Sequence, residues 1–267
     1  MKRTYLIVFS FSLLLFASGC ESAIQSPTPD VNLTDIVLTV THLADRTPTP
    51  TITSTPEATP TSTPIVFTSD TETLFRDDFN AELKPGWQWL NENPINWSLA
   101  NIPGSLQIQA EPGYINFGNA KNLLLRPAPQ GDFFVETSVN FLPDESDQFA
   151  GVVLFESIAN FAQAGLGYCL PAVGCPGQGH YLDIYQNGIY ALPRNPTQYF
   201  GNTLAIRLVV EGNIVSLFTS PDGKAWYRSY QRAINFDIQQ VGLFAGQNND
   251  TLNIPATFEY FEIGKFK

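Results

Sequence analysis

The sequence is poor in basic residues, in histidine and in long apolar runs, and each shortage excludes a class of function. Lys and Arg total 14 against 25 Asp and Glu, which gives a formal net charge of −11. A chain of this sign does not attract nucleic acid or anionic lipid at long range. We therefore expect no nucleic-acid partner, and basic or neutral partners fit the chain better.

Carboxylates are also missing where a hydrolase would need them. Cleavage of a glycosidic bond uses two carboxylates about 5 to 10 Å apart, and enzymes built on β-sandwiches often carry them at alternating positions of one strand. The segment 135–140, VETSVN, has the right alternation but a single acid, Glu136. We interpret Glu136 as a solvated or hydrogen-bonded residue on a sheet face. A serine–histidine pair is not expected either, because His180 is the only histidine outside the N-terminal region.

The N-terminal apolar run is too short to cross a bilayer. It covers residues 5–16, behind Lys2 and Arg3, whereas a membrane span takes about twenty residues. This pattern predicts a signal peptide over residues 1–20. Its end, Ala-Ser-Gly-Cys20, resembles a bacterial lipobox, so we expect diacylation of Cys20 and a lipid-anchored protein on the bacterial cell surface or the extracytoplasmic face of the membrane. An ordinary signal peptide with a coincidental cysteine remains the alternative.

A change of composition marks the start of a folded domain. Residues 47–64, TPTPTITSTPEATPTSTP, are nearly all Thr, Pro and Ser, a composition that cannot bury enough apolar surface to fold. We therefore predict a disordered linker or stalk over residues 21–73, followed by one domain over residues 74–267, which we expect to be monomeric.

The pattern of this domain predicts an all-β fold. Apolar residues alternate with polar ones over 135–141 and 204–210, and turn signals such as Asn187-Gly188 and Ser-Pro-Asp-Gly223 recur between such runs. No stretch keeps a helical period for ten residues. Short strands joined by tight turns favour two packed antiparallel sheets, a β-sandwich.

Two parts of the sequence resemble a known family. The opening segment, 75–109, combines an Asp-Asp pair, two tryptophans two positions apart, a Trp-Ser-Leu and a Pro-Gly turn; the closing segments are 204–223, 241–245 and 256–263. Together they resemble the concanavalin A-like domain at the C-terminus of β-xylosidases. The resemblance implies a jelly-roll β-sandwich, a glycan ligand, and a structural calcium where the terminal strands meet. Asp78 and Glu259 are the expected calcium ligands, and no other cofactor is required.

Aromatic residues with polar neighbours are the candidate glycan contacts, because sugar rings stack on aromatic faces. Tyr181, Asp183 and Tyr185 alternate onto one face, and Arg207 projects opposite the leucine stripe of its strand. If both open on the same concave sheet, they form a binding groove. Arg207 in an inter-strand pair, and the tryptophans in core packing, are the alternatives. The main candidates are Trp87, Trp89, Gln163, Tyr168, Tyr181, Asp183, Tyr185 and Arg207, and Tyr190 and Tyr199 are further aromatic candidates.

Cys169 and Cys175 lie in a Gly- and Pro-rich loop of a chain that is expected to leave the cytoplasm. We predict a disulfide between them. The alternative makes both cysteines and His180 metal ligands, but it lacks a fourth ligand because His42 lies in the linker.

These observations predict a non-catalytic, carbohydrate-binding surface lipoprotein. A glycoside hydrolase or lyase of the same fold, and a structural or protein-binding module of the cell envelope, remain as alternatives.

Overall fold

The computed structural model describes residues 70–173, 175–191, 197–248 and 253–267. Within these ranges the chain forms β-strands and three short 3-10 helices, η1 (Pro94–Asn96), η2 (Ile115–Phe117) and η3 (Pro171–Val173). None of these helices is long and apolar enough to cross a bilayer. The predicted signal peptide, Cys20 and nearly all of the predicted linker lie outside the described residues.

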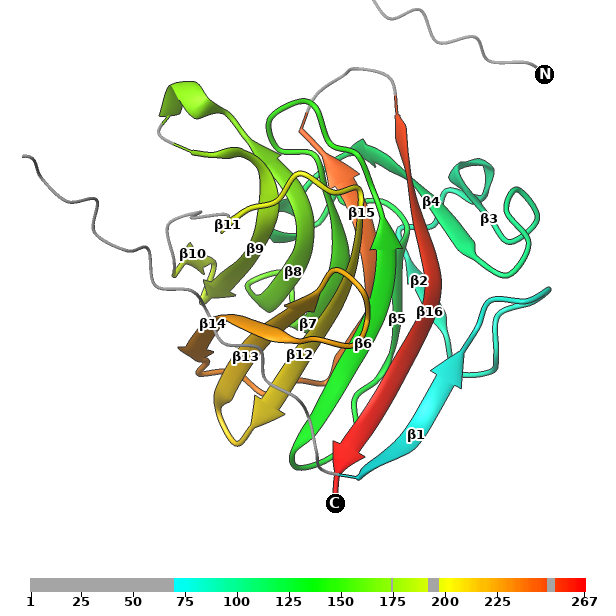
Figure 1. Cartoon of the computed structure of the whole chain (residues 1–267), viewed down its shortest axis with the longest axis vertical. Helices are drawn as coiled ribbons and strands as arrows, with labels where there is room; N and C mark the ends of the chain where they lie inside the picture. Colours follow the sequence, from blue (N-terminus) through cyan, green and yellow to red (C-terminus); the bar gives the residue numbers. More distant parts are fainter. Residues whose placement is uncertain (1–69, 174, 192–196, 249–252) are drawn as a thin grey trace, which may run out of the picture. The chain divides into compact units, whose positions relative to one another are not determined.

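The strands form two sheets, as predicted. Sheet I runs in the order β3-β4-β16-β6-β12-β13-β14, with β1 pairing with β16 beyond the end of β4. Figure 1 shows β16, β6 and β12 side by side in this sheet. Its strands are β1 (Thr71–Asp77), β3 (Trp97–Ser98), β4 (Leu106–Pro112), β6 (Phe133–Asn140), β12 (Thr203–Glu211), β13 (Ile214–Ser220), β14 (Tyr227–Ala233) and β16 (Ile254–Phe266).

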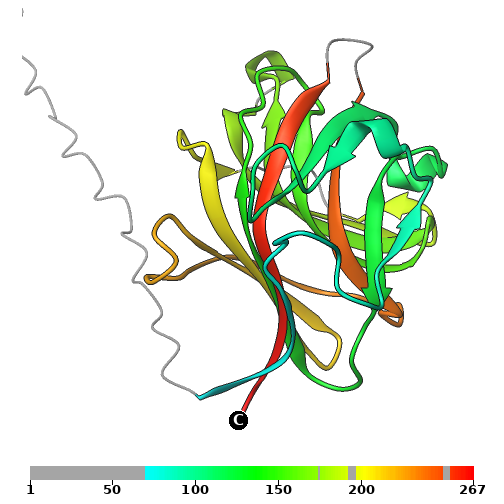
Figure 2. The same cartoon turned by 90° about the vertical axis from the view of Figure 1, so that its right-hand side faces the viewer.

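Sheet II has β9 near one edge and β2 at the other, in the order β9-β8-β7-β15-β5-β2, and β10 and β11 both pair with β9. A short parallel pairing of β15 with the end of β4 joins the two otherwise antiparallel sheets. In Figure 2, β16 (red) and β15 (orange) lie in different layers. The strands are β2 (Gln88–Leu90), β5 (Leu123–Pro127), β7 (Phe149–Ser157), β8 (Asn160–Cys169), β9 (Gly177–Gln186), β10 (Ile189–Tyr190), β11 (Thr197–Gln198) and β15 (Gln240–Gln247).

The main core lies between the sheets and follows the period of two. The predicted stripe of β12, including Leu204, Ile206 and Leu208, faces the core, and Ala164 and Leu166 of β8 approach it from sheet II. Because successive side chains of a strand point to opposite faces, every second residue is left on an outer face. These outer faces carry most of the candidate site residues.

Two features of the sequence set local geometry. Asn187 and Gly188 both adopt positive φ, 54° and 75°, as a two-residue hairpin turn requires. Gly151 and Gly165 face each other across β7 and β8, where an added Cβ on Gly165 would come within 1.9 Å of the Ala150 carbonyl oxygen. Only glycine permits this close approach of the two strands.

Candidate functional site

Five of the predicted contact residues gather at sheet II. Gln163, Tyr181, Asp183 and Tyr185 lie on its face away from the main core, where Gln163 and Asp183 are direct neighbours across β8 and β9. Tyr168, near the end of β8, lines a small cavity beside Tyr181 and Asp183.

This face is closed rather than open. Gln163 is 4% exposed, Asp183 1% and Tyr181 6%, and a second apolar cluster that includes Ile115 and Ala120 packs on the same face. The ring of Tyr185 stacks on Phe161 with 4.6 Å between centroids. The rings therefore contact one another and leave no open platform for a sugar in this part of the described chain.

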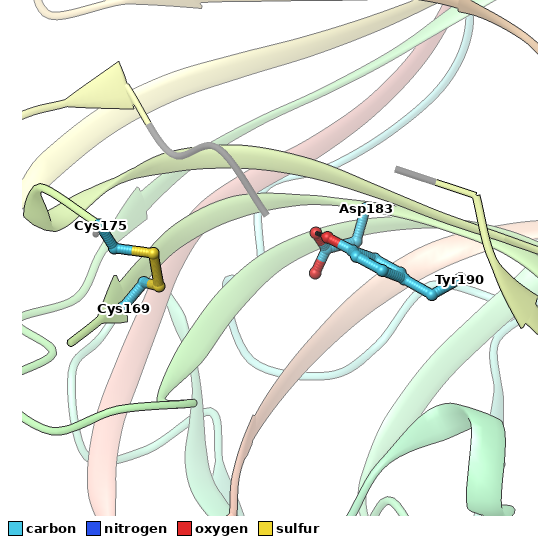
Figure 3. Close-up of a disulfide and its surroundings, with 4 residues drawn as sticks. All are labelled: Cys169, Cys175, Asp183 and Tyr190. Carbon is cyan, nitrogen blue, oxygen red and sulfur yellow. Dashed lines mark hydrogen bonds between the residues drawn. A yellow bond between two sulfur atoms is a disulfide. The ribbon is translucent and has the colours of Figure 1, made fainter. Parts of the chain in front are cut away.

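Asp183 is the centre of a buried polar network. Its carboxylate accepts hydrogen bonds from the Tyr190 hydroxyl, at 2.6 Å, and from the Gln163 side-chain amide, at 3.2 Å. Figure 3 shows Tyr190 reaching Asp183 from the neighbouring strand. Burial raises the pKa of Asp183 to about 6, although these two hydrogen bonds act in the opposite direction. The Asp183 carboxylate is therefore buried on this face with hydrogen-bond partners.

The cavity beside Tyr181 measures about 20 Å³, which holds about one water molecule. The Tyr181 hydroxyl is buried and has no hydrogen-bond partner among the described residues. The space admits a single small polar group and is far too small for a sugar ring.

The predicted disulfide is confirmed. Cys169 at the end of β8 is bonded to Cys175, with a Cα–Cα distance of 5.5 Å, and Figure 3 shows it a short way from Asp183. Since both sulfur atoms are in the disulfide, the alternative in which these cysteines and His180 bind a metal is wrong.

Arg207 does not join the tyrosines. It lies on the outer face of sheet I, so the main core separates it from Tyr181, and its guanidinium forms a 2.5 Å ion pair with Glu136 of the neighbouring strand. The same group lies over the rings of Trp226 and Phe134, at 4.4 and 4.7 Å. The expected common groove is thus not formed, and Arg207 makes the inter-strand pair that was the alternative.

Glu136 is a hydrogen-bonded face residue, as interpreted from the sequence. Besides Arg207, it accepts a hydrogen bond from the Tyr260 hydroxyl at 2.6 Å.

Trp87 and Trp89 pack against the main core and are half-buried. The indole nitrogen of Trp87 donates to Asp77 at 2.9 Å, and its ring lies 4.9 Å from that of Phe261. Trp89 lies 4.8 Å from Trp97. These contacts are those of core packing, the alternative left open by the sequence.

The expected calcium ligands have other surroundings. Asp78 forms an ion pair with Arg76 at 2.8 Å, and Glu259 is exposed. Among the described residues, no three His, Cys, Asp or Glu side chains are grouped to hold a metal ion. Calcium binding by Asp78 and Glu259 stays a prediction.

An open cleft lies elsewhere, between β9 and β11 of sheet II and β13 and β14 of sheet I. We call it the edge cleft; its volume is about 440 Å³. Sequence patterns gave Tyr199 as an aromatic candidate but missed most of the other groups. The lining residues are His180, Thr197, Tyr199, Leu204, Thr219, Pro221, Tyr227, Arg228 and Ser229.

A β-bulge directs Ser229 into this cleft. Leu217 pairs with Tyr230 and Phe218 with Arg228, which leaves Ser229 as the extra residue of β14. Its hydroxyl lies 2.8 Å from Nε2 of His180 and 3.2 Å from the Thr219 hydroxyl. Bulges re-aim side chains in this way and are frequent beside functional sites. A strict period of two cannot reveal such a position.

His180 is neutral in this setting. It is 6% exposed, and burial lowers its pKa to about 4. Its Nδ1 atom has no hydrogen-bond partner among the described residues. The sequence excluded a serine–histidine pair because only one histidine is present, yet the structure forms one. At neutral pH an imidazole of this pKa is a weak base, and no carboxylate among the described residues hydrogen-bonds to it. The pair is therefore suited to hydrogen bonding rather than to activating a nucleophile.

Comparison with known proteins places the fold. The model of the β-xylosidase C-terminal concanavalin A-like domain matches residues 76–264. The chain belongs to this family.

A GH43 protein of Bacillus licheniformis is 22% identical, with a TM-score of 0.63 over 70% of this chain and 38% of its own. The xylan β-1,4-xylosidase of Bacillus halodurans C-125 is 18% identical, with a TM-score of 0.60 over 71% of this chain and 39% of its own. This chain therefore spans about two fifths of either protein. A CBM2 module of the evolved Dit of Lactobacillus casei BL23 phage J-1 is 10% identical, with a TM-score of 0.53 over 74% of this chain and 97% of its own. These likenesses show the fold. No curated protein sequence matches the chain.

Proposed function

We propose that the domain binds a carbohydrate in the edge cleft without cleaving it. The observation that carries the proposal is the cleft itself, which at about 440 Å³ falls in the size range of small-molecule sites, roughly 300 to 1,000 Å³. It combines tyrosine rings with hydroxyl groups and a neutral imidazole. That combination suits a sugar, which offers apolar C–H faces and hydroxyls together.

Individual side chains suit these roles. The Tyr199 hydroxyl donates to the Thr203 carbonyl oxygen at 2.6 Å, which fixes the orientation of its ring. The linked hydroxyls of Thr219 and Ser229 can each donate or accept. His180 Nε2 holds the Ser229 hydroxyl, and the direction of the hydrogen bonds in this chain of three groups decides which hydroxyl donates to a ligand and which accepts from it.

Two further points support binding over cleavage. Hydrolysis would need two carboxylates around the sugar, and none is among the described residues that line the cleft. In addition, the phage module with this fold carries the name CBM2. The proposal includes the delivery expected from the sequence: an exported monomer that is lipid-anchored at Cys20 and presents the cleft on the cell surface.

The test compares one cleft residue with one aromatic residue elsewhere. Tyr227→Ala removes a half-exposed ring from the cleft, and Phe117→Ala removes a ring that is 71% exposed on another part of the surface. We expect Tyr227→Ala to weaken binding of an oligosaccharide found by glycan array several-fold, since a stacking contact contributes about 1 kcal/mol, and Phe117→Ala to leave it unchanged.

Reducing-sugar release is measured on the same oligosaccharide. Release of sugar by the wild-type chain would refute the non-catalytic role. Equal binding by wild type and Tyr227→Ala would refute the cleft as the site.

A further inference from the structure

The charges around the edge cleft differ from those of the chain as a whole. The chain has a net charge of −11, yet the described residues that line the cleft include no Asp or Glu and one arginine, Arg228. At physiological ionic strength, charges farther than about 8 Å away are largely screened. The nearest acid in the sequence, Asp222, follows the lining residue Pro221, and its carboxylate accepts hydrogen bonds from the Ser220 hydroxyl and from the backbone N–H groups of Lys224 and Ala225. Arg228 is therefore the charged group of the cleft lining that is left to a ligand.

Arg228 also differs from the other described arginines. It is exposed and makes no ion pair or hydrogen bond to a described residue, whereas each of the others has a partner. The others are Arg76, which pairs with Asp78 and Glu262; Arg126, which lies over the Phe75 ring; Arg207, which pairs with Glu136; and Arg232, which donates to the Gln231 carbonyl oxygen.

The geometry points to an acidic sugar as the ligand: we propose that the edge cleft binds a glycan bearing a uronic acid, whose carboxylate pairs with Arg228. This inference rests on the proposed function and names its ligand class. The planar guanidinium matches a carboxylate with two parallel hydrogen bonds. Arg228 is paired in register with Phe218 of the outer face, so its side chain reaches the carboxylate at the rim of the cleft. The ring of the sugar lies against the tyrosines, and its hydroxyls reach Ser229.

The experiment measures binding of the full-length chain to matched pairs of oligosaccharides by calorimetry. Each pair is an acidic oligomer, such as an oligogalacturonide or a glucuronate-bearing xylo-oligosaccharide, and its carboxyl-reduced form, which differs only in lacking the charge. We expect the acidic member of at least one pair to bind about five- to tenfold more tightly, the range of a partly exposed charge-assisted contact. This preference should shrink as NaCl is raised.

Variants assign the preference to a residue. Arg228→Gln should abolish it and Arg228→Lys should keep part of it, because Lys retains the charge without the planar fork. Arg232→Gln, on the same strand but outside the cleft lining, is the matched control and should keep the full preference.

The two proposals fail differently. Equal affinity for acidic and carboxyl-reduced forms, or a preference that survives Arg228→Gln, would overturn the uronic acid while the Tyr227→Ala test still holds for the cleft. Stronger binding of a sulfated oligosaccharide than of any uronate would also overturn it. Absence of binding to every glycan would overturn both proposals.

Discussion

Tyr181 offers a sharp test of the buried network on sheet II. Its hydroxyl is buried and without a partner among the described residues, beside a cavity of about 20 Å³. Burying an unpaired hydroxyl costs about 1 to 3 kcal/mol, whereas the phenyl ring of phenylalanine carries no such cost. Tyr181→Phe should therefore stabilise the domain by about 1 kcal/mol, which for a domain of this size raises the Tm by about 2 to 4 °C.

A tyrosine on the opposite face provides the control. The hydroxyl of Tyr260 donates to Glu136 at 2.6 Å, so Tyr260→Phe removes a charge-assisted hydrogen bond and should destabilise the domain by about 1 to 2 kcal/mol. Urea unfolding of both variants and of the wild type gives the comparison. A loss of stability in Tyr181→Phe would show that a bound water already pairs with this hydroxyl and would refute the reasoning.

Four further predictions concern titration and covalent chemistry. The pKa of His180 falls from 6.5 to about 4 on folding, so the stability that depends on neutral His180 is fully present above pH 6.5. About 3 kcal/mol of it is lost as the pH falls through 4. His180→Asn should remove this part of the pH dependence, and an unchanged profile would contradict the prediction. Asp183 acts in the opposite sense, because its pKa rises from 3.8 to about 6 on folding. As the pH rises from 4 to 6 the unfolded state loses this proton before the folded state does, so the stability of the domain should fall. Asp183→Asn should remove this fall, as measured by urea unfolding at each pH. Replacing Cys169 and Cys175 by Ser should lower the stability of the domain by about 2 kcal/mol, and intact-mass analysis of the wild type should find no free thiol at either position. Cys20→Ala should abolish acyl-chain labelling in cells.

Local signals in the sequence predicted the fold and its turns. The alternation over β12 placed Leu204, Ile206 and Leu208 in the core, and Asn187-Gly188 formed the expected turn. The disulfide followed from composition and the expected export. Each of these depends on neighbouring residues in the chain.

The candidate site was harder to predict because alternation fixes the face of a strand but not the sheet to which the strand belongs. Tyr181 and Arg207 both project away from the core, yet they lie on opposite sides of it. Burial of Tyr185 depends on contacts with Phe161 of the neighbouring strand. Ser229, which contacts His180, is the extra residue of a bulge in β14, and alternation in the sequence does not predict a bulge.

Nuclear magnetic resonance of the imidazole nitrogens tests the central claim most directly. The chain has two histidines, His42 and His180, so a His42→Gln variant assigns both sets of signals. Saturation with a bound oligosaccharide should shift the Nε2 signal of His180, the atom that lies 2.8 Å from the Ser229 hydroxyl of the cleft, and leave His42 unchanged. An oligosaccharide that binds the protein without moving any His180 signal would contradict carbohydrate binding in the edge cleft.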